Sequence, residues 1–258
     1  MALLGNTASF LGGTITSAPG ECWPTASYTA SWSYIPSPMD SPNVVGVVNG
    51  TDPELQDQHI VVGAHLDHLG IIDGRIHNGA VDNATGSAVV MEVAESIAAD
   101  PLPRPVVFVL FTAEEVGHFG SLQFVAEGPI PVEKIFAYLN VDHAGRDNPS
   151  FDDILAAGLK RIDPRVEEVV RSANLRAGVA LHFMESMREQ DYSGSDHYSF
   201  DQAGIPSVVY GTGLFEGYHT PDDDAEFVEY KFTFDMAKIT LETVMELGKK
   251  TTTLRHRN

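Results

Sequence analysis

The sequence predicts a single α/β domain in three layers, with a central, twisted, mostly parallel (mixed) β-sheet flanked by helices. Short β-branched and apolar runs alternate with helical stretches along the chain, which is the order that joins parallel strands through crossover helices. The chain has 258 residues, of which 43% are hydrophobic and 20% charged, a globular composition that is long enough for one large domain. We therefore expect one domain over residues 1–258.

The first half of the chain supplies three of the predicted strands. Residues 1–43 are rich in Gly, Ser, Thr and Pro, and we expect irregular chain there, with short strands at most. The β-branched runs NVVGVVNG (43–50) and HIVVGAH (59–65) predict two strands separated by a polar segment. Residues 84–100 carry apolar side chains at helical spacing and predict a helix of about four turns. The apolar run PVVFVLFT (105–112) predicts a strand that is buried on both faces.

The second half continues the alternation. A short helical stretch near 117–127 precedes the apolar run IFAYLNVD (135–142), which predicts another buried strand. The segment DPRVEEVVRSANL (163–175) begins with Asp and Pro, two residues that favour a helix start. GIPSVVYG (204–211) predicts a late strand, and residues 230–250 predict a closing amphipathic helix.

Charge and hydropathy exclude several classes of partner. The chain has 36 acidic and 16 basic residues, a formal net charge of −20, and such a surface repels phosphate backbones, so we expect no nucleic-acid partner. No stretch approaches the roughly 18–20 unbroken apolar residues of a membrane helix, so we expect no membrane span. Cys22 is the only cysteine, which excludes an internal disulfide and a thiolate metal site.

The sequence does not predict a single cellular compartment. The opening residues MALLGNTASFLGG lack both the basic region and the long apolar core of a signal peptide. A strongly acidic composition occurs in soluble proteins of saline or extracellular habitats and in ordinary acidic proteins. A secreted or periplasmic location is therefore one alternative.

Acidic residues and histidines follow the predicted strands, where ligands collect in open α/β sheets. His65 and Asp67 point the same way from an extended chain, so Asp67 is placed to orient His65. Glu114 and Glu115 follow the most hydrophobic strand, and Asp142 ends another. Carboxylates at the ends of buried strands are costly unless a positive group lies against them.

Two further candidates have ordinary alternatives. Asp82 precedes a predicted helix, where it would also serve as an N-cap, and His219 would also suit a surface loop. Together, two histidines and three carboxylates suit a pair of divalent ions, most naturally zinc, with one carboxylate bridging. Such a pair activates a water and polarises a carbonyl or phosphoryl oxygen. One of the adjacent glutamates would then bind metal, and its neighbour would accept the proton.

Six motifs carry a resemblance to a known family: VVGAHLDH, GAVDNATGSA, FTAEEVGHFGS, YLNVDHAG, SDHYSFDQAGIPS and YHTPDDD. In order and spacing they resemble the co-catalytic zinc aminopeptidase family, which includes bacterial leucyl aminopeptidases, glutamate carboxypeptidases and glutaminyl cyclases. The resemblance runs from Asn43 to the C-terminal helix and implies a zinc-exopeptidase-like fold. It implies that His65 and Asp142 bind one zinc ion, that Glu115 and His219 bind the other, and that Asp82 bridges the two.

The resemblance also implies roles for neighbouring residues. Glu114 matches the general base of the family, and Asp67 matches the acid that supports the first histidine. Tyr218 stands where some relatives use a tyrosine to stabilise the oxyanion. Ser195-Asp196-His197 matches a segment that we interpret as support beside the site, and the bond between Asp82 and Asn83 is expected to be cis.

We therefore expect a metal-dependent aminopeptidase that hydrolyses peptides with a free N-terminus, using two zinc ions, a bridging water and Glu114. The alternatives are a glutaminyl cyclase, a non-catalytic binding protein, or a carboxypeptidase, for which Arg188 is the only arginine in 182–192. Phe183, Met184 and Met187 predict a pocket for bulky apolar N-terminal residues, with ordinary core packing as the alternative. The sequence predicts no oligomeric state.

Overall fold

The computed structural model describes residues 8–16, 27–34, 41–146, 154–157, 163–184 and 194–254, and it groups the chain into two compact units, 1–41 and 42–258. In the first unit, β1 (Ala8–Thr16) pairs antiparallel with β2 (Ser27–Tyr34) as a two-stranded sheet of its own. The sequence predicts short strands at most in this segment, and the structure forms two strands there because the two segments pair through backbone hydrogen bonds. The expectation of one domain over residues 1–258 stays a prediction.

Residues 42–258 are built around a seven-stranded sheet in the order β10-β9-β11-β8-β4-β7-β3. Its strands are β3 (Val44–Val48), β4 (His59–His65), β7 (Val106–Phe111), β8 (Ile135–Val141), β9 (Ile154–Ala157), β10 (Leu181–Phe183) and β11 (Ser207–Gly211). Strand β4 is parallel to both of its neighbours, β7 and β8, and β11 is parallel to β8. The β3–β7 and β9–β11 pairs are antiparallel. The expectation of a mixed, mostly parallel sheet is confirmed.

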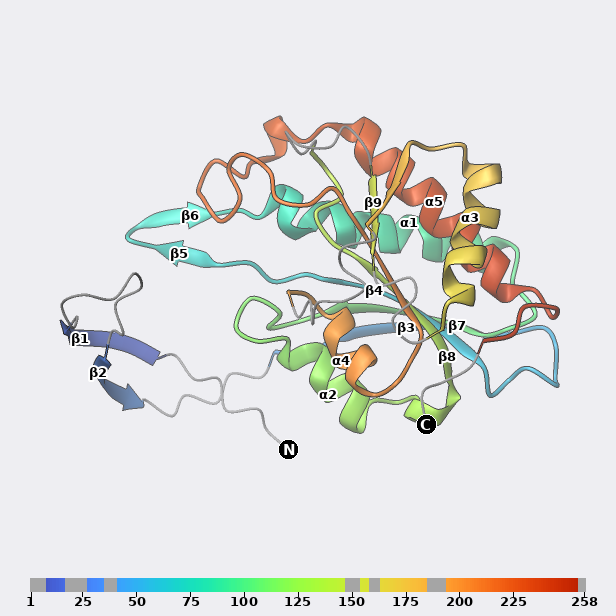
Figure 1. Ribbon diagram of the computed structural model, residues 1–258, viewed down its shortest axis with the longest axis horizontal. Coiled ribbons are helices and arrows are strands. Elements are labelled where there is room, and N and C mark those ends of the chain that lie inside the picture. The colour runs from blue at the N-terminus through green and yellow to red at the C-terminus, as the bar shows by residue number, and fades with distance from the viewer. Residues whose placement is uncertain are drawn as a thin grey trace. The chain divides into compact units, whose positions relative to one another are not determined.

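Helices cover both faces of this sheet. The helices are α1 (Thr85–Ala99), α2 (Phe119–Glu127), α3 (Arg165–Ala177), α4 (His197–Gln202) and α5 (Tyr230–Gly248). In Figure 1, α1, α3 and α5 lie above the sheet, and α2 and α4 lie below it. The two faces bury separate clusters because successive strand side chains point to opposite sides. Ile60 and Val62 join the larger cluster, and Val61 joins the smaller one.

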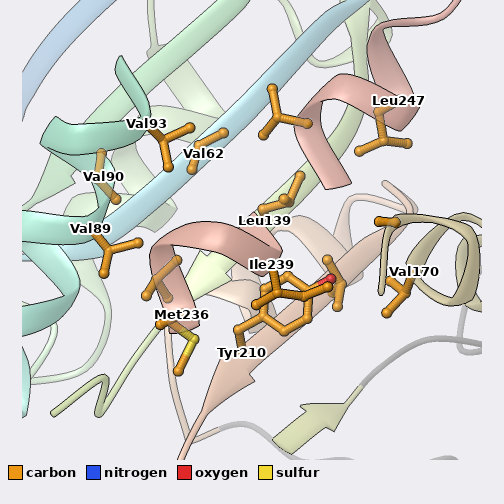
Figure 2. Packing of buried hydrophobic residues seen from close by; sticks show 14 of the residues in the cluster. Val62, Val89, Val90, Val93, Leu139, Val170, Tyr210, Met236, Ile239 and Leu247 are labelled. Carbon is orange, nitrogen blue, oxygen red and sulfur yellow. The ribbon is translucent and has the colours of Figure 1, made fainter. Parts of the chain in front are cut away.

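The larger cluster fills the layer between the sheet and α1, α3 and α5. Figure 2 shows Leu139 of β8 and Val62 of β4 near side chains of these helices, among them Ile239 and Val93. On the opposite face, the Tyr138 ring stacks on Phe200 with 3.7 Å between ring centroids. The apolar runs that predict the strands are therefore the residues that fill both cores.

Several short elements were not predicted. They are β9, β10 and α4, together with the hairpin of β5 (Gly70–Ile72) and β6 (Arg75–His77). Strands of three or four residues are too short for periodicity to reveal. The hairpin has a recognisable signal, because Asp73-Gly74 is a favoured turn pair and both residues adopt positive φ. Within the described ranges, none of the helices has the length and apolarity to cross a membrane.

The core position of Leu139 gives a test of this packing. Its side chain is fully buried, so Leu139→Ala leaves a cavity and should lower the free energy of unfolding by about 2–5 kcal/mol. Leu175→Ala is the matched control, because Leu175 is 88% exposed and its loss should cost less than about 0.5 kcal/mol. Urea unfolding followed by circular dichroism measures both. Equal losses in the two variants would contradict the described core.

Candidate metal centre

Three parallel strands bring the predicted site residues to one edge of the sheet. His65 is the last residue of β4, Asp142 directly follows β8, and Glu114 and Glu115 follow β7 after two intervening residues. Because β4 lies between β7 and β8 and runs parallel to both, their carboxyl ends meet. Asp82 comes from the turn before α1, a π-helical segment η1 (Ala80–Ala84).

One group of donor atoms surrounds His65. Its Nε2 atom lies 3.2 Å from Oδ1 of Asp82 and 3.3 Å from Oδ1 of Asp142. All three side chains are buried. One ligand atom from each of these residues falls within 4.8 Å of the other two, as a single metal ion requires. These are the two ligands and the bridging carboxylate that the resemblance implies for the first zinc ion.

A second group lies on the other side of Asp82. Nε2 of His219 is 3.1 Å from Oδ2 of Asp82 and 3.1 Å from Oε2 of Glu115. Asp82 therefore presents one carboxylate oxygen to each group. The structure thus brings together all five residues that the sequence predicts as ligands.

The chemistry of these atoms fits divalent metal ions. The groups consist of carboxylate oxygens and imidazole nitrogens, the donors that zinc takes in proteins. Oδ2 of Asp82 is buried and has no hydrogen-bond partner among the described residues, although His219 lies beside it. Buried polar atoms are normally hydrogen-bonded, and a cation bound in this cluster would satisfy the oxygen.

The backbone around Asp82 is fixed from two sides. The carboxylate of Asp223 accepts hydrogen bonds from the backbone N–H groups of Val81 (2.8 Å) and Asp82 (3.1 Å). The amide of Asn83 donates to the main-chain oxygen of Val141 at 2.9 Å. The Asp82–Asn83 bond is cis, which confirms the expectation from the resemblance. Asp223, which the sequence analysis did not single out, thus orients the shared carboxylate.

Asp67 acts through both its backbone and its side chain. Nδ1 of His65 lies 3.0 Å from the main-chain oxygen of Asp67 and 3.8 Å from its carboxylate. The carboxylate instead accepts hydrogen bonds from the backbone N–H groups of Glu114 (3.1 Å) and Glu115 (3.3 Å). Asp67 is therefore placed to orient His65 and also holds the turn that carries both glutamates.

Tyr218 lies against the second group. Its ring stacks on His219 with 3.8 Å between centroids and meets the ring of His143 edge-on at 5.2 Å. Burial and the nearby carboxylates, first among them Asp82, raise the pKa of the Tyr218 hydroxyl above its ordinary value. The hydroxyl therefore keeps its proton at neutral pH and is a hydrogen-bond donor.

Three more histidines reach the site. Nε2 of His143, the residue after Asp142, lies 3.5 Å from Oδ1 of Asp82. Burial lowers the pKa of His143, but the Asp142 and Asp82 carboxylates outweigh it and raise the pKa to about 9. The sequence analysis assigned no role to His68 or His118, although both stand inside the quoted motifs. His68 contacts Glu115 and His118 contacts Glu114.

The support segment lies beneath the site. Ser195 accepts a hydrogen bond from Asn140, two residues before Asp142, at 2.8 Å. Asp196 is fully buried, and neither of its carboxylate oxygens has a hydrogen-bond partner among the described residues. Burial raises the pKa of Asp196 to about 7.

The expected specificity pocket is only partly described. The Phe183 ring lies under the guanidinium of Arg171, 3.9 Å from it, and Met184 continues β10 through a backbone hydrogen bond to Ala156. Met187 and Arg188 lie outside the described residues. The predicted preference for bulky apolar residues stays a prediction.

The chain is similar in sequence to known peptidases. Residues 43–244 match the profile of Peptidase family M28. Aminopeptidase YwaD of Bacillus subtilis is 26% identical over 217 residues, which cover 81% of this chain and 45% of that protein. The probable glutamate carboxypeptidase LAMP1 of Arabidopsis thaliana is 29% identical over 206 residues, which cover 72% of this chain and 28% of that protein. The chain thus spans less than half the length of these two relatives.

The same fold occurs in a solved structure. The zinc aminopeptidase BSAP from Bacillus subtilis superposes with a TM-score of 0.69 at 24% identity, over 81% of this chain and 50% of that one. The likeness shows that the two proteins share a fold.

The buried carboxyl of Asp196 predicts a dependence of stability on pH. Folding raises the pKa of this carboxyl from 3.8 to about 7. Below about pH 4 the carboxyl is protonated in both the folded and the unfolded protein, so it does not lower the free energy of unfolding. As the pH rises from 4 through 7, the unfolded protein ionises more readily and the free energy of unfolding falls. Asp196→Asn carries no such charge, so it should gain up to about 4 kcal/mol over the unmodified protein between these pH values. Urea unfolding of chelator-treated protein at a series of pH values measures this difference. Parallel stability curves would contradict the assignment.

Proposed function

The chain belongs to Peptidase family M28, and we propose that it is a metallo-aminopeptidase that uses two zinc ions to remove N-terminal residues from peptides. One observation carries the proposal. The two carboxylate oxygens of Asp82 face separate donor groups, one with His65 and Asp142 and one with Glu115 and His219. A carboxylate shared in this way suits a pair of metal ions.

The residues present would divide the ions as the resemblance implies. His65 and Asp142 would hold one ion, Glu115 and His219 the other, and Asp82 both. When bound, such ions supply Lewis acidity toward a peptide carbonyl and make a water more acidic.

Glu114 is the residue proposed to move the proton. It lies beside Glu115 at the end of β7, in a turn that the carboxylate of Asp67 holds in place. Glu114 accepts the proton of the attacking water and returns it to the leaving amine, as a general base that becomes a general acid. The protonated hydroxyl of Tyr218 is the proposed donor to the oxyanion that forms at the carbonyl.

The similar proteins favour a free N-terminus as the substrate end. Aminopeptidase YwaD of Bacillus subtilis and leucine aminopeptidase 1 of Fusarium vanettenii are both named for aminopeptidase activity. These names support aminopeptidase over carboxypeptidase activity.

Substrate ends test the proposed activity. A leucine-initiated tripeptide should release leucine, and N-acetylation should abolish the release because it removes the ammonium group. Amidation of the C-terminus is the matched control and should leave the rate unchanged. Liquid chromatography of the products measures all three. Loss of activity on amidation rather than acetylation would indicate a carboxypeptidase, and formation of pyroglutamate from an N-terminal Gln peptide would indicate a cyclase.

The paired glutamates give a second test. Glu114→Gln keeps the shape of the side chain but cannot accept a proton, so turnover should fall by about 10²–10⁴-fold or more while metal content stays near two per chain. Glu115→Gln should instead lose one metal ion. Zinc content by elemental analysis and kcat on a leucine substrate are the measurements. If the two variants exchanged these properties, the assignment of base and ligand would be wrong.

A further inference from the structure

Glu114 and Glu115 are adjacent and chemically identical, yet the proposed function gives them different tasks. One ligand atom each from His65, Glu114 and Glu115 lies within 4.8 Å of the other two. Glu114 is therefore close enough to serve as a metal ligand itself. Something other than distance has to separate the base from the ligand.

Each glutamate has one carboxylate oxygen held by a histidine of its own. Nδ1 of His68 lies 2.6 Å from Oε1 of Glu115. Nε2 of His118 lies 3.2 Å from Oε1 of Glu114. The two contacts come from different parts of the chain, since His68 follows β4 and His118 precedes α2.

Because His68 contacts only one carboxylate oxygen of Glu115, the other oxygen is free to face the candidate metal site. Oε2 of Glu115 faces Nε2 of His219 at 3.1 Å. The His68 side chain is 7% exposed and packs where only a glycine fits, because a Cβ on Gly79 would lie 2.5 Å from Cγ of His68. Gly79 also has a φ of +65°, which favours glycine. Gly79 therefore leaves room for the His68 side chain, whose Nδ1 contacts Glu115.

The His118 contact depends on an unusual backbone. His118 has a φ of 58° and a ψ of 28°, a left-handed conformation that few non-glycine residues adopt. Its backbone N–H donates to the main-chain oxygen of Glu114 at 2.9 Å, which closes the turn between the two residues. In this turn the imidazole points back onto the Glu114 carboxylate.

We propose that His68 and His118 are positioning residues that divide the labour of the paired glutamates, an inference that rests on the proposed function. His68 holds Oε1 of Glu115 and leaves Oε2 as the metal ligand. Groups that orient a ligand in this way typically contribute about 10–100-fold to metal affinity. His118 holds Oε1 of Glu114 and so keeps this carboxylate from binding the metal. The Glu114 carboxylate is then free to accept the proton of the attacking water.

Two pairs of variants test the proposal. His68→Leu and His118→Leu remove the contact, while His68→Asn and His118→Gln keep an amide N–H near the position of the imidazole nitrogen that makes it. Zinc affinity is measured by competition with a chromogenic chelator, zinc content by elemental analysis, and kcat and KM on a leucine substrate. His182→Leu, at an exposed position of β10, is the control and should change none of these quantities.

The two arms predict different losses. His68→Leu should weaken binding of one of the two zinc ions by about 10–100-fold and leave the other unchanged, and His68→Asn should restore most of the affinity. His118→Leu should keep both ions with undiminished affinity while kcat falls by up to about 10²-fold at constant KM, and His118→Gln should restore much of kcat. A purely structural role would lower both properties in both variants.

Several results would overturn the proposal. Equal zinc loss in His68→Asn and His68→Leu would make His68 a ligand, and unchanged zinc binding in both would leave it without a role. Zinc loss or an unchanged kcat in His118→Leu would contradict the proposed role of His118 in positioning Glu114. Failure of the proposed function shows separately, in unmodified protein that binds fewer than two zinc ions or releases no amino acid.

Discussion

The shared carboxylate of Asp82 is the constraint on which the site depends. Asp82 is 2% exposed, and each of its two carboxylate oxygens faces a separate group of candidate metal ligands. Burial raises the pKa of Asp82, but His143 and His65 outweigh it and hold the pKa well below the ordinary value. A buried charge of this kind persists only where its surroundings compensate it. The histidines around it are that compensation.

The sheet supplies the position of these groups, and local backbone geometry supplies their direction. Parallel pairing of β4 with β7 and β8 brings three strand ends together, which places His65, Asp142 and the two glutamates within reach of one another. Among the described residues, five non-glycine residues have positive φ, and four of them, Ala113, His118, His143 and His219, belong to or adjoin the site. Such conformations cost of order 1–3 kcal/mol each and persist where surrounding contacts enforce them. Strained turns therefore set the directions of several side chains at the site.

Much of this arrangement was predictable from the sequence. Long apolar runs marked the central strands, and β4 begins and ends where its pattern predicts, because burial on both faces leaves little choice of residue. Three of the five candidate ligands, His65, Glu115 and Asp142, were recognisable as polar residues that end or follow apolar strands. Asp82 and His219 were recognisable through the resemblance of their motifs to the family. The hydrogen-bond partners were not, because His68, His118 and Asp223 act through contacts between segments distant in sequence or through a left-handed turn. The short strands β9 and β10 were not predicted, because a periodic pattern cannot be recognised over three or four residues.

Charge compensation is the second requirement of the site. Asp82, Glu114, Glu115 and Asp142 place four carboxylates in a largely buried region. Divalent ions would compensate these charges. In the absence of ions, protons on histidine take the same role: burial lowers the pKa of His65, but Asp142 and Asp82 outweigh it and raise the pKa well above the ordinary value. Because a ligating imidazole must be neutral, metal ions and these protons compete for the same carboxylates.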